Sequence, residues 1–198
     1  MRINGRGKVL AVAVAGAVAM VAGVAFRLWQ EAQAKKIEAG KIEAAGMAAP
    51  IAQAEIRELA RRIRIVDLFM RGNPRLDRET AETYADYVGE AAARYGLPQE
   101  VLAGLIYTES RADPWARNKD CLGLTQVRWT VWGKILRGNH PGIYEWHDLF
   151  NPRKNIMAGA WILRHYLDRS ADLDEALRRY SGGAAWYPGR VMAVARSL

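Results

Sequence analysis

The chain has 198 residues, 51% of them hydrophobic, which is enough for one domain of ordinary size and an additional segment. Its single cysteine, Cys121, excludes an intramolecular disulfide, and no Cys/His spacing indicates a zinc site or a thiol nucleophile, so no metal or cofactor is expected. The net charge of +8 is concentrated at one end, because residues 1–76 carry 13 Lys/Arg and 6 Asp/Glu, whereas residues 77–198 carry 16 and 15.

The first predicted element is an apolar helix. Val9–Phe26 is an uncharged run of 18 residues, and as a helix it would extend about 27 Å, close to the hydrocarbon thickness of a bilayer. A single-pass membrane anchor is favoured, because the run is longer than a usual signal-peptide core and Trp29 suits a membrane interface. The alternatives are a signal peptide cleaved after Ala32-Gln33-Ala34 and an Ala-rich helix buried in an assembly. We therefore expect residues 1–30 to form a transmembrane or signal-anchor helix.

Residues 31–76 are predicted to form a helical linker and a basic amphipathic helix. Lys35–Ala49 is rich in Ala, Glu and Lys, and we expect this helical stretch to stop near Pro50. Ile51–Arg71 places apolar residues at helical spacing with arginines between them. This helix either packs on the following domain with a solvated basic face or binds a membrane surface or a partner. Nucleic acid is not expected as a partner, because no base-recognition motif accompanies the basic residues.

Residues 77–198 are predicted to form one mainly α domain. The sequence shows no sustained strand alternation, although a short hairpin between Asp113 and Leu122 is compatible with it. Helical periodicity and capping residues predict helices over Ala81–Tyr95, Pro98–Glu109, Leu124–Leu136, Lys154–Leu167, Leu173–Tyr180 and Trp186–Ser197.

A carboxylate, Glu109, ends one of these apolar helices. Leu102, Leu105 and Ile106 share its inward face at helical spacing. Burial beside these side chains would favour the protonated carboxyl group, as a general acid for cleaving a sugar–sugar bond requires. The alternative is a glutamate at a helix end with its carboxylate in water, and the motifs that follow favour the first interpretation.

Three motifs follow Glu109-Ser110 along the chain. They are Gly123-Leu124-Thr125-Gln126-Val127, then Leu149-Phe150-Asn151-Pro152 leading into Asn155-Ile156-Met157-Ala158-Gly159, and finally Tyr180-Ser181-Gly182-Gly183. With Glu109-Ser110 they resemble, over about 60% of the chain, the lytic transglycosylases of the soluble, goose-type-lysozyme-like superfamily. Thr125 stands where that family usually has Met, and Ser181 where it usually has Asn.

The resemblance implies a lysozyme-like catalytic domain over residues 77–198 that cleaves the β-1,4 bond between N-acetylmuramic acid and N-acetylglucosamine. Members of the family use one glutamate, here Glu109, as acid and then as base. The substrate's N-acetyl group and its muramic C6 hydroxyl do the rest, giving a 1,6-anhydro product without a metal or cofactor. The alternatives are a hydrolytic lysozyme, and a wall-penetrating or assembly component of a phage particle or secretion channel with weak or no catalysis.

The matched motifs also supply candidate substrate-binding residues. The amide of Gln126 suits acetamido groups, and Tyr180 is expected near Glu109 and the reacting sugar. Ser110 either contacts the substrate or caps its helix, and Asn155 either contacts the substrate or shapes the groove wall. Trp129 either stacks on a sugar face or packs in the core.

The predicted activity decides the expected localisation. A peptidoglycan enzyme must face the wall, so we expect an inner-membrane protein with its N-terminus inside and its catalytic domain in the periplasm. A phage virion component, or a protein exported after signal cleavage, is the alternative. The expected partners are glycan strands, the membrane through residues 9–26, and a larger envelope-spanning or virion assembly.

Overall fold

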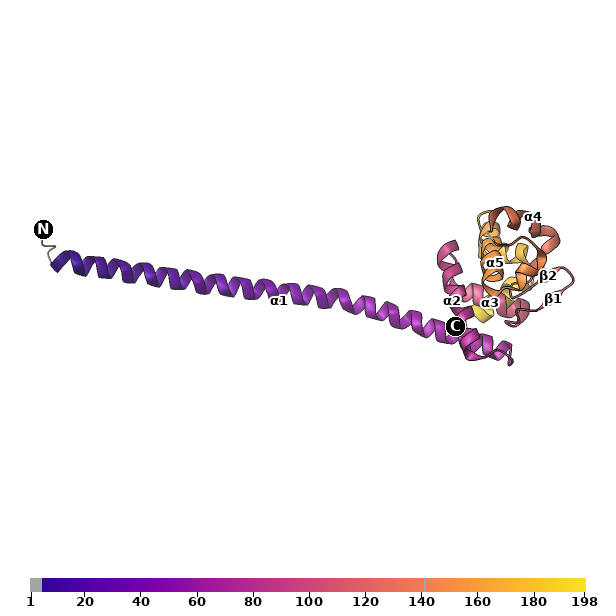
Figure 1. Cartoon of the computed structure of the whole chain (residues 1–198), viewed down its shortest axis with the longest axis horizontal. Coiled ribbons are helices and arrows are strands. Elements are labelled where there is room, and N and C mark those ends of the chain that lie inside the picture. Colours follow the sequence, from indigo (N-terminus) through magenta and orange to yellow (C-terminus); the bar gives the residue numbers. More distant parts are fainter. Residues whose placement is uncertain (1–4, 141) are drawn as a thin grey trace. The chain divides into compact units, whose positions relative to one another are not determined.

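The computed structural model describes the backbone of residues 5–140 and 142–198 and the side chains of residues 23–24, 26–41, 50–140 and 142–198. The chain divides into two compact units, Met1–Ile56 and Arg57–Leu198. The elements (Figure 1) are, in chain order, α1 (Gly5–Gly72), α2 (Arg78–Tyr95), α3 (Gln99–Ser110), β1 (Arg117–Asn118), β2 (Cys121–Leu122), β3 (Val127–Arg128), α4 (Trp129–Asn139), the 3₁₀ helix η1 (Trp146–Phe150), α5 (Pro152–Leu167), α6 (Leu173–Tyr180) and α7 (Tyr187–Ala195).

The first unit consists of the N-terminal part of α1. This helix continues through Pro50, where the sequence predicted a stop. That prediction was wrong, because helix-forming residues on both sides outweigh the backbone hydrogen bond that proline removes. The predicted transmembrane run Val9–Phe26 lies largely outside the residues whose side chains are described. Within the part of the chain that is described, no helix has the length and apolar character needed to cross a membrane.

The end of α1 belongs to the core of the second unit. Ile65, Val66, Leu68 and Phe69 are each at most 4% exposed, and they pack in one apolar cluster with residues of α2, α3, α5, α6 and α7. The predicted basic helix therefore packs on the domain that follows it, at least over its last turns. Residues 57–72 supply part of that domain's core and are more than a linker to it.

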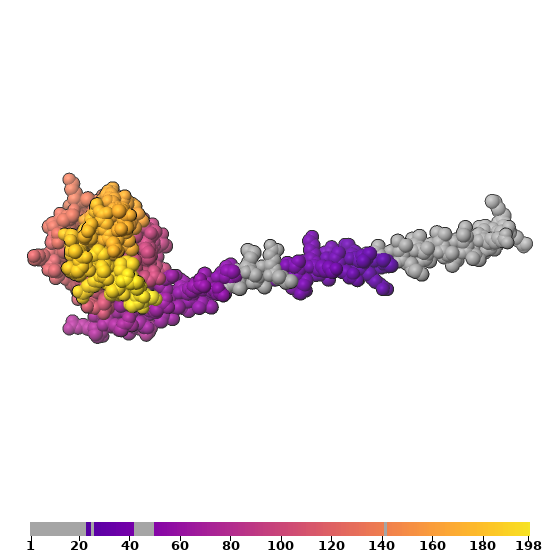
Figure 2. Space-filling model, turned by 180° about the vertical axis from the view of Figure 1, so that it is seen from behind, coloured from indigo at the N-terminus to yellow at the C-terminus, as the bar shows by residue number. Residues whose placement is uncertain are grey.

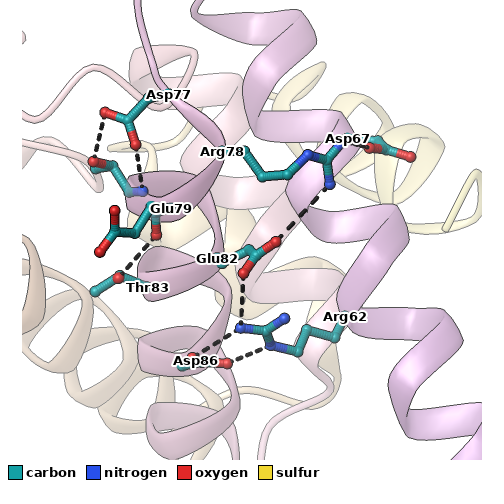
Figure 3. A network of polar contacts seen from close by, with 9 residues as sticks. Arg62, Asp67, Asp77, Arg78, Glu79, Glu82, Thr83 and Asp86 are labelled. Atoms are coloured by element: carbon teal, nitrogen blue, oxygen red, sulfur yellow. Dashed lines mark hydrogen bonds and ion pairs between the residues drawn. The ribbon is translucent and has the colours of Figure 1, made fainter.

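Ion pairs add to this contact between α1 and α2 (Figure 3). The guanidinium of Arg62 binds the carboxylate of Asp86 with N–O distances of 2.6 and 3.1 Å, and it lies 3.8 Å from Glu82. Arg78 lies 3.6 Å from Asp67. Exposed pairs such as these stabilise a fold by about 1 kcal/mol or less each, so burial of the apolar residues is the larger contribution.

A small antiparallel sheet, in the order β1-β2-β3, precedes α4. The predicted hairpin is present as β1 and β2, and β3 extends it. The sequence predicted a helix from Leu124, which was wrong, because α4 begins only at Trp129. Two features prevent a helix here: the backbone N–H of Thr125 donates to the Asn155 side chain, and Gln126 has a φ of +49°.

The C-terminal helices complete the second unit. Figure 2 shows them in yellow beside the orange segment that includes α5. Helix α7 packs closely on α3, because Gly104 of α3 has no side chain: a Cβ atom there would lie 2.7 Å from the carbonyl oxygen of Val191. This close approach brings the N-terminal end of α7 beside the C-terminal end of α3.

Candidate active site

A cavity of about 290 Å³ opens at the C-terminal end of α3. Its walls come from α3, the sheet, α4, α5, α6 and α7, and it brings together three of the predicted site residues, Glu109, Gln126 and Tyr180. Among the lining residues, all of which belong to the described part of the chain, Glu109 is the only carboxylate. Asp113 and Asp120, the next acidic residues along the chain after Glu109, do not line it.

The carboxyl group of Glu109 is largely removed from water. Burial raises the pKa of this carboxyl group above its ordinary value of 4.5, and a hydrogen bond from Tyr187 opposes part of that rise. No described Lys, Arg or His side chain lies within ion-pair distance of it. The site therefore favours a proton-bearing glutamate, as the apolar face of its helix predicted.

Tyr187 is the side chain in direct contact with that carboxyl group. Its hydroxyl donates a hydrogen bond of 2.5 Å to Oε1 of Glu109, and the residue is 3% exposed. Burial and the nearby negative charge of Glu109 raise the pKa of the Tyr187 hydroxyl, which therefore stays protonated as a donor. The sequence analysis did not single out Tyr187, because it lies 78 residues from Glu109 and meets it only through the packing of α7 on α3.

Tyr180 lines the same cavity from the end of α6. Its hydroxyl donates to the carbonyl oxygen of Thr125 at 2.9 Å. Burial, and after it the charge of Glu109, raises the pKa of the Tyr180 hydroxyl. The charge of Glu109 therefore acts on the Tyr180 hydroxyl, but that hydroxyl donates its hydrogen bond to the backbone and not to Glu109.

Gln126 is held in an uncommon backbone conformation, with a φ of +49°. Its side-chain Nε2 donates to the carbonyl oxygens of Ala116 and Gly123, both at 2.9 Å. These two bonds fix the amide at the cavity wall and leave the amide oxygen as an acceptor. A φ in this region costs free energy in a residue other than glycine, and such strain is concentrated at functional sites.

Asn155 is completely buried and holds the loop before β3 against α5. Its Oδ1 accepts from the backbone N–H and the hydroxyl of Thr125 at 2.8 and 2.7 Å. Its Nδ2 donates to the carbonyl oxygens of Leu122 and Leu149, both at 2.8 Å. Gly123 makes this arrangement possible, because a Cβ there would lie 2.3 Å from Nδ2. We call these four bonds the Asn155 cradle; Asn155 itself is not a lining residue of the cavity.

Ser110 and Trp129 also lie outside the lining of the cavity. The buried hydroxyl of Ser110 donates to the carbonyl oxygen of Leu124 at 2.7 Å, which ties the end of α3 to the loop before β3. The Trp129 ring is half-buried against α4, where Gly133 gives it room and the guanidinium of Arg137 lies 5.1 Å from its centroid. Neither side chain lines the cavity; Ser110 holds the loop before β3, and Trp129 packs on α4.

The second unit is mainly α, with one small sheet and a cavity at the end of α3, which is consistent with a lysozyme-like domain. The model of the Transglycosylase SLT domain family matches residues 86–188, just over half of the chain, and the chain belongs to this family. The resemblance drawn from the four sequence motifs is thereby confirmed.

Curated relatives carry transglycosylase names. A protein of Enterobacteria phage PRD1 named Transglycosylase is 36% identical over 115 residues, which are 53% of this chain and 40% of the relative. Membrane-bound lytic murein transglycosylase C of Edwardsiella ictaluri is 36% identical over 87 residues, which are 42% and 24%. The protein of that name in Haemophilus influenzae (strain PittEE) is 33% identical over 98 residues, which are 44% and 27%. The matched part is thus less than half of each relative. No solved structure matches the chain significantly.

Proposed function

We propose that the second unit cleaves the β-1,4 bond between N-acetylmuramic acid and N-acetylglucosamine, with Glu109 as acid and then base and a 1,6-anhydro-muramoyl product. The environment of Glu109 carries the proposal: it is the only carboxylate among the described residues that line the cavity, and its carboxyl group is desolvated. Glycosidases that use water commonly need two carboxylates. One carboxylate suffices when the substrate supplies its own nucleophile.

In the first step, the protonated Glu109 donates its proton to the oxygen of the glycosidic bond. The bond between C1 of the muramic residue and that oxygen breaks, and N-acetylglucosamine leaves as the free alcohol. The carbonyl oxygen of the muramic 2-acetamido group forms a bond to C1 as the glycosidic bond breaks, and the positive charge that develops on C1 passes to the resulting oxazolinium ring. Glu109 is now a carboxylate, and the hydrogen bond from Tyr187 stabilises this charge in its desolvated position.

In the second step, the Glu109 carboxylate removes the proton of the muramic C6 hydroxyl. The C6 oxygen forms a bond to C1 while the bond from the acetamido oxygen to C1 breaks. The product carries a 1,6-anhydro ring, and Glu109 has regained the proton it gave in the first step. The raised pKa of Glu109 serves both steps, since it increases the protonated fraction of the acid at the start and makes the carboxylate a stronger base.

The other site residues either line the cavity with Glu109 or support its walls. We infer that the amide oxygen of Gln126, held by the bonds of its Nε2, accepts from the N–H of an acetamido group. Tyr180 limits the cavity beside Glu109. We infer that Ser110, Asn155 and Trp129 act on the substrate only through the shape of the cavity, because none of them lines it.

The test is digestion of purified peptidoglycan with the full chain, followed by mass spectrometry of the released muropeptides. We expect products one water lighter than ordinary reducing ends from the unaltered chain and none from Glu109→Gln. Asp113→Asn is the matched control, because its carboxylate binds the backbone N–H of Trp115 outside the cavity, and this variant should keep the activity.

The other outcomes decide between the alternatives. Ordinary reducing ends would make the protein a hydrolytic lysozyme. No cleavage by any variant would favour a wall-binding or assembly component. The full chain is the protein to test, because the end of α1 supplies Ile65 and Phe69 to the core.

We also propose that Val9–Phe26 anchors the chain in the inner membrane, with the second unit in the periplasm. Support comes from the uncharged run of 18 residues in the sequence. A phage is the second candidate setting, because the chain is similar to a protein of Enterobacteria phage PRD1 named Transglycosylase; in that setting we propose a component of the virion. Alkaline extraction of membranes distinguishes them: an anchored chain stays in the pellet and is cleaved by protease added to the periplasmic side, whereas copurification with particles would favour the virion.

A further inference from the structure

A second cavity, of about 410 Å³, lies away from Glu109 in the same unit. It is lined by the C-terminal half of α2, the end of α4 and the beginning of α5. The two cavities share no lining residue, and their nearest lining residues on α5, Met157 of this cavity and Ile162 of the first, are five residues apart, about 7.5 Å along the helix. The two cavities are therefore separate sites on opposite halves of α5.

The lining of the second cavity is basic. It contains Arg94, Arg153 and Lys154 and, among its described residues, no carboxylate. Arg153 binds Glu90 and Lys154 binds Asp148 at 2.7 Å, both from outside the lining. Arg94 has no carboxylate within ion-pair distance in the described part of the chain. Glu90 and the Tyr95 side chain interact with Arg94 without forming an ion pair, so its guanidinium can still attract an anion, with two more cations close by.

His140 gives the cavity a buried polar atom without a partner. The residue is 8% exposed, and its Nε2 has no hydrogen-bond partner among the described residues. Its ring is fixed by an edge contact with Trp161, at a centroid distance of 5.3 Å. Burial and the charge of Arg94 lower the pKa of His140, so the ring is neutral at pH 7. A buried polar atom without a partner costs free energy, and an oxyanion would remove that cost if the His140 side chain shifts to present Nε2, in its N–H tautomer, to the cavity.

We propose that this second cavity binds a carboxylate of a peptidoglycan stem peptide, with Arg94 as its charge partner and His140 and Asn139 as neutral donors. The peptide as the source of the anion rests on the proposed function. The shared chemistry is an oxyanion, which inorganic phosphate also offers. The volume and the aromatic walls of Tyr87 and Tyr95 fit the body of a peptide better than a single small ion.

The test uses calorimetric titration of the full chain with a sugar-free stem tetrapeptide, the same peptide with its carboxylates amidated, and inorganic phosphate. We expect the tetrapeptide to bind, Arg94→Gln to weaken it about tenfold or more, and amidation to weaken it by a similar factor. Arg75→Gln is the matched control, because Arg75 is exposed and lines neither cavity; it should leave the affinity unchanged. Asn139→Asp, which adds a negative charge to the cavity, should abolish binding and carries the test if Arg94→Gln does not fold.

Three results would contradict the proposed binding of the stem peptide. Absence of tetrapeptide binding, equal loss in Arg94→Gln and Arg75→Gln, or phosphate binding as tight as that of the peptide would overturn the proposal. The probe contains no sugar, so its binding does not depend on cleavage. Digestion of peptidoglycan without tetrapeptide binding would contradict this inference alone, and binding without digestion would contradict the proposed function alone.

Discussion

Glu109 and Asn155 are two polar side chains that the fold removes from water, and their surroundings differ. The four hydrogen bonds of the Asn155 cradle end on β2, on the loop before β3 and on η1, so the polar atoms of that amide are satisfied. Glu109 receives one hydrogen bond, from Tyr187, and burial raises its pKa. A buried polar group with all its partners stabilises a fold, whereas a desolvated carboxyl group without a counter-ion is ready to transfer a proton.

The largest effect is expected from Glu109→Gln, which should lower the activity without lowering the stability. Glu109→Gln should lower the rate of muropeptide release about 10²–10⁴-fold, because it removes the general acid and base. Its free energy of unfolding at pH 7 should equal or exceed that of the unaltered chain, since a neutral amide is easier to bury than a carboxylate. Rate assays and urea unfolding on the same samples measure both, and a loss of stability parallel to the loss of activity would contradict the comparison.

Substitution of Asn155 should, in contrast, lower the stability of the fold. Asn155→Ala should lower the free energy of unfolding by about 2–4 kcal/mol, because it leaves the buried backbone groups of Leu122, Thr125 and Leu149 without partners. Asn139→Ala is the control, since Asn139 is exposed at the end of α4, and it should change stability by about 0.5 kcal/mol or less. Urea unfolding followed by circular dichroism measures the difference, and similar values for the two variants would refute the structural role of Asn155.

A smaller effect sharpens the role of Tyr187. Its hydrogen bond lowers the pKa of Glu109, so Tyr187→Phe should raise that pKa further and move the pH profile of cleavage upward. The maximal rate should fall about tenfold, because the carboxylate formed in the first step loses its donor. Tyr180→Phe is the matched control: its hydroxyl donates to the backbone of Thr125, and its pH profile should keep its position. Identical profiles for both variants would contradict the role given to Tyr187.

The smallest effect is the pH dependence of stability. Since the folded pKa of Glu109 is raised, the folded protein binds more protons than the unfolded chain between about pH 4.5 and that higher pKa. The contribution of Glu109 to the free energy of unfolding must therefore fall as the pH rises through this window. Glu109→Gln lacks this dependence, and the difference in stability between the two proteins should grow with pH. A difference that stays constant from pH 4 to pH 8 would exclude a raised pKa.

The sequence offers Glu109 as the candidate acid because its signal is local, and this assignment stays a prediction. Leu102, Leu105 and Ile106 lie on the same helical face as Glu109, and helical register alone places them together. Tyr187 could not be predicted in this way, since its contact with Glu109 depends on how closely α7 approaches α3 at Gly104. Long-range packing of this kind leaves no periodic pattern in the sequence.

The fold class followed from helical periodicity, and the errors came where tertiary contacts override it. The sequence of the loop before β3 predicts a helix. The backbone N–H of Thr125 instead donates to the Asn155 side chain, and a helix does not form there. The partner of Thr125 lies 30 residues further along the chain, so local residues could not predict the structure of this loop. For the basic helix over residues 51–71 the sequence left two outcomes open, packing on the following domain or binding a membrane surface or a partner, and the full burial of Ile65 and Phe69 shows that its last turns pack on the domain.

The central claim is that Glu109 is a desolvated acid, and a direct titration of its side chain tests it. The carboxyl carbon of Glu109, assigned by comparison with Glu109→Gln, can be followed by NMR from pH 3 to pH 9 in the full chain. The account predicts a midpoint above the ordinary value of 4.5 that rises further in Tyr187→Phe. A midpoint at or below 4.5 would show a solvated or ion-paired carboxylate and would contradict the account.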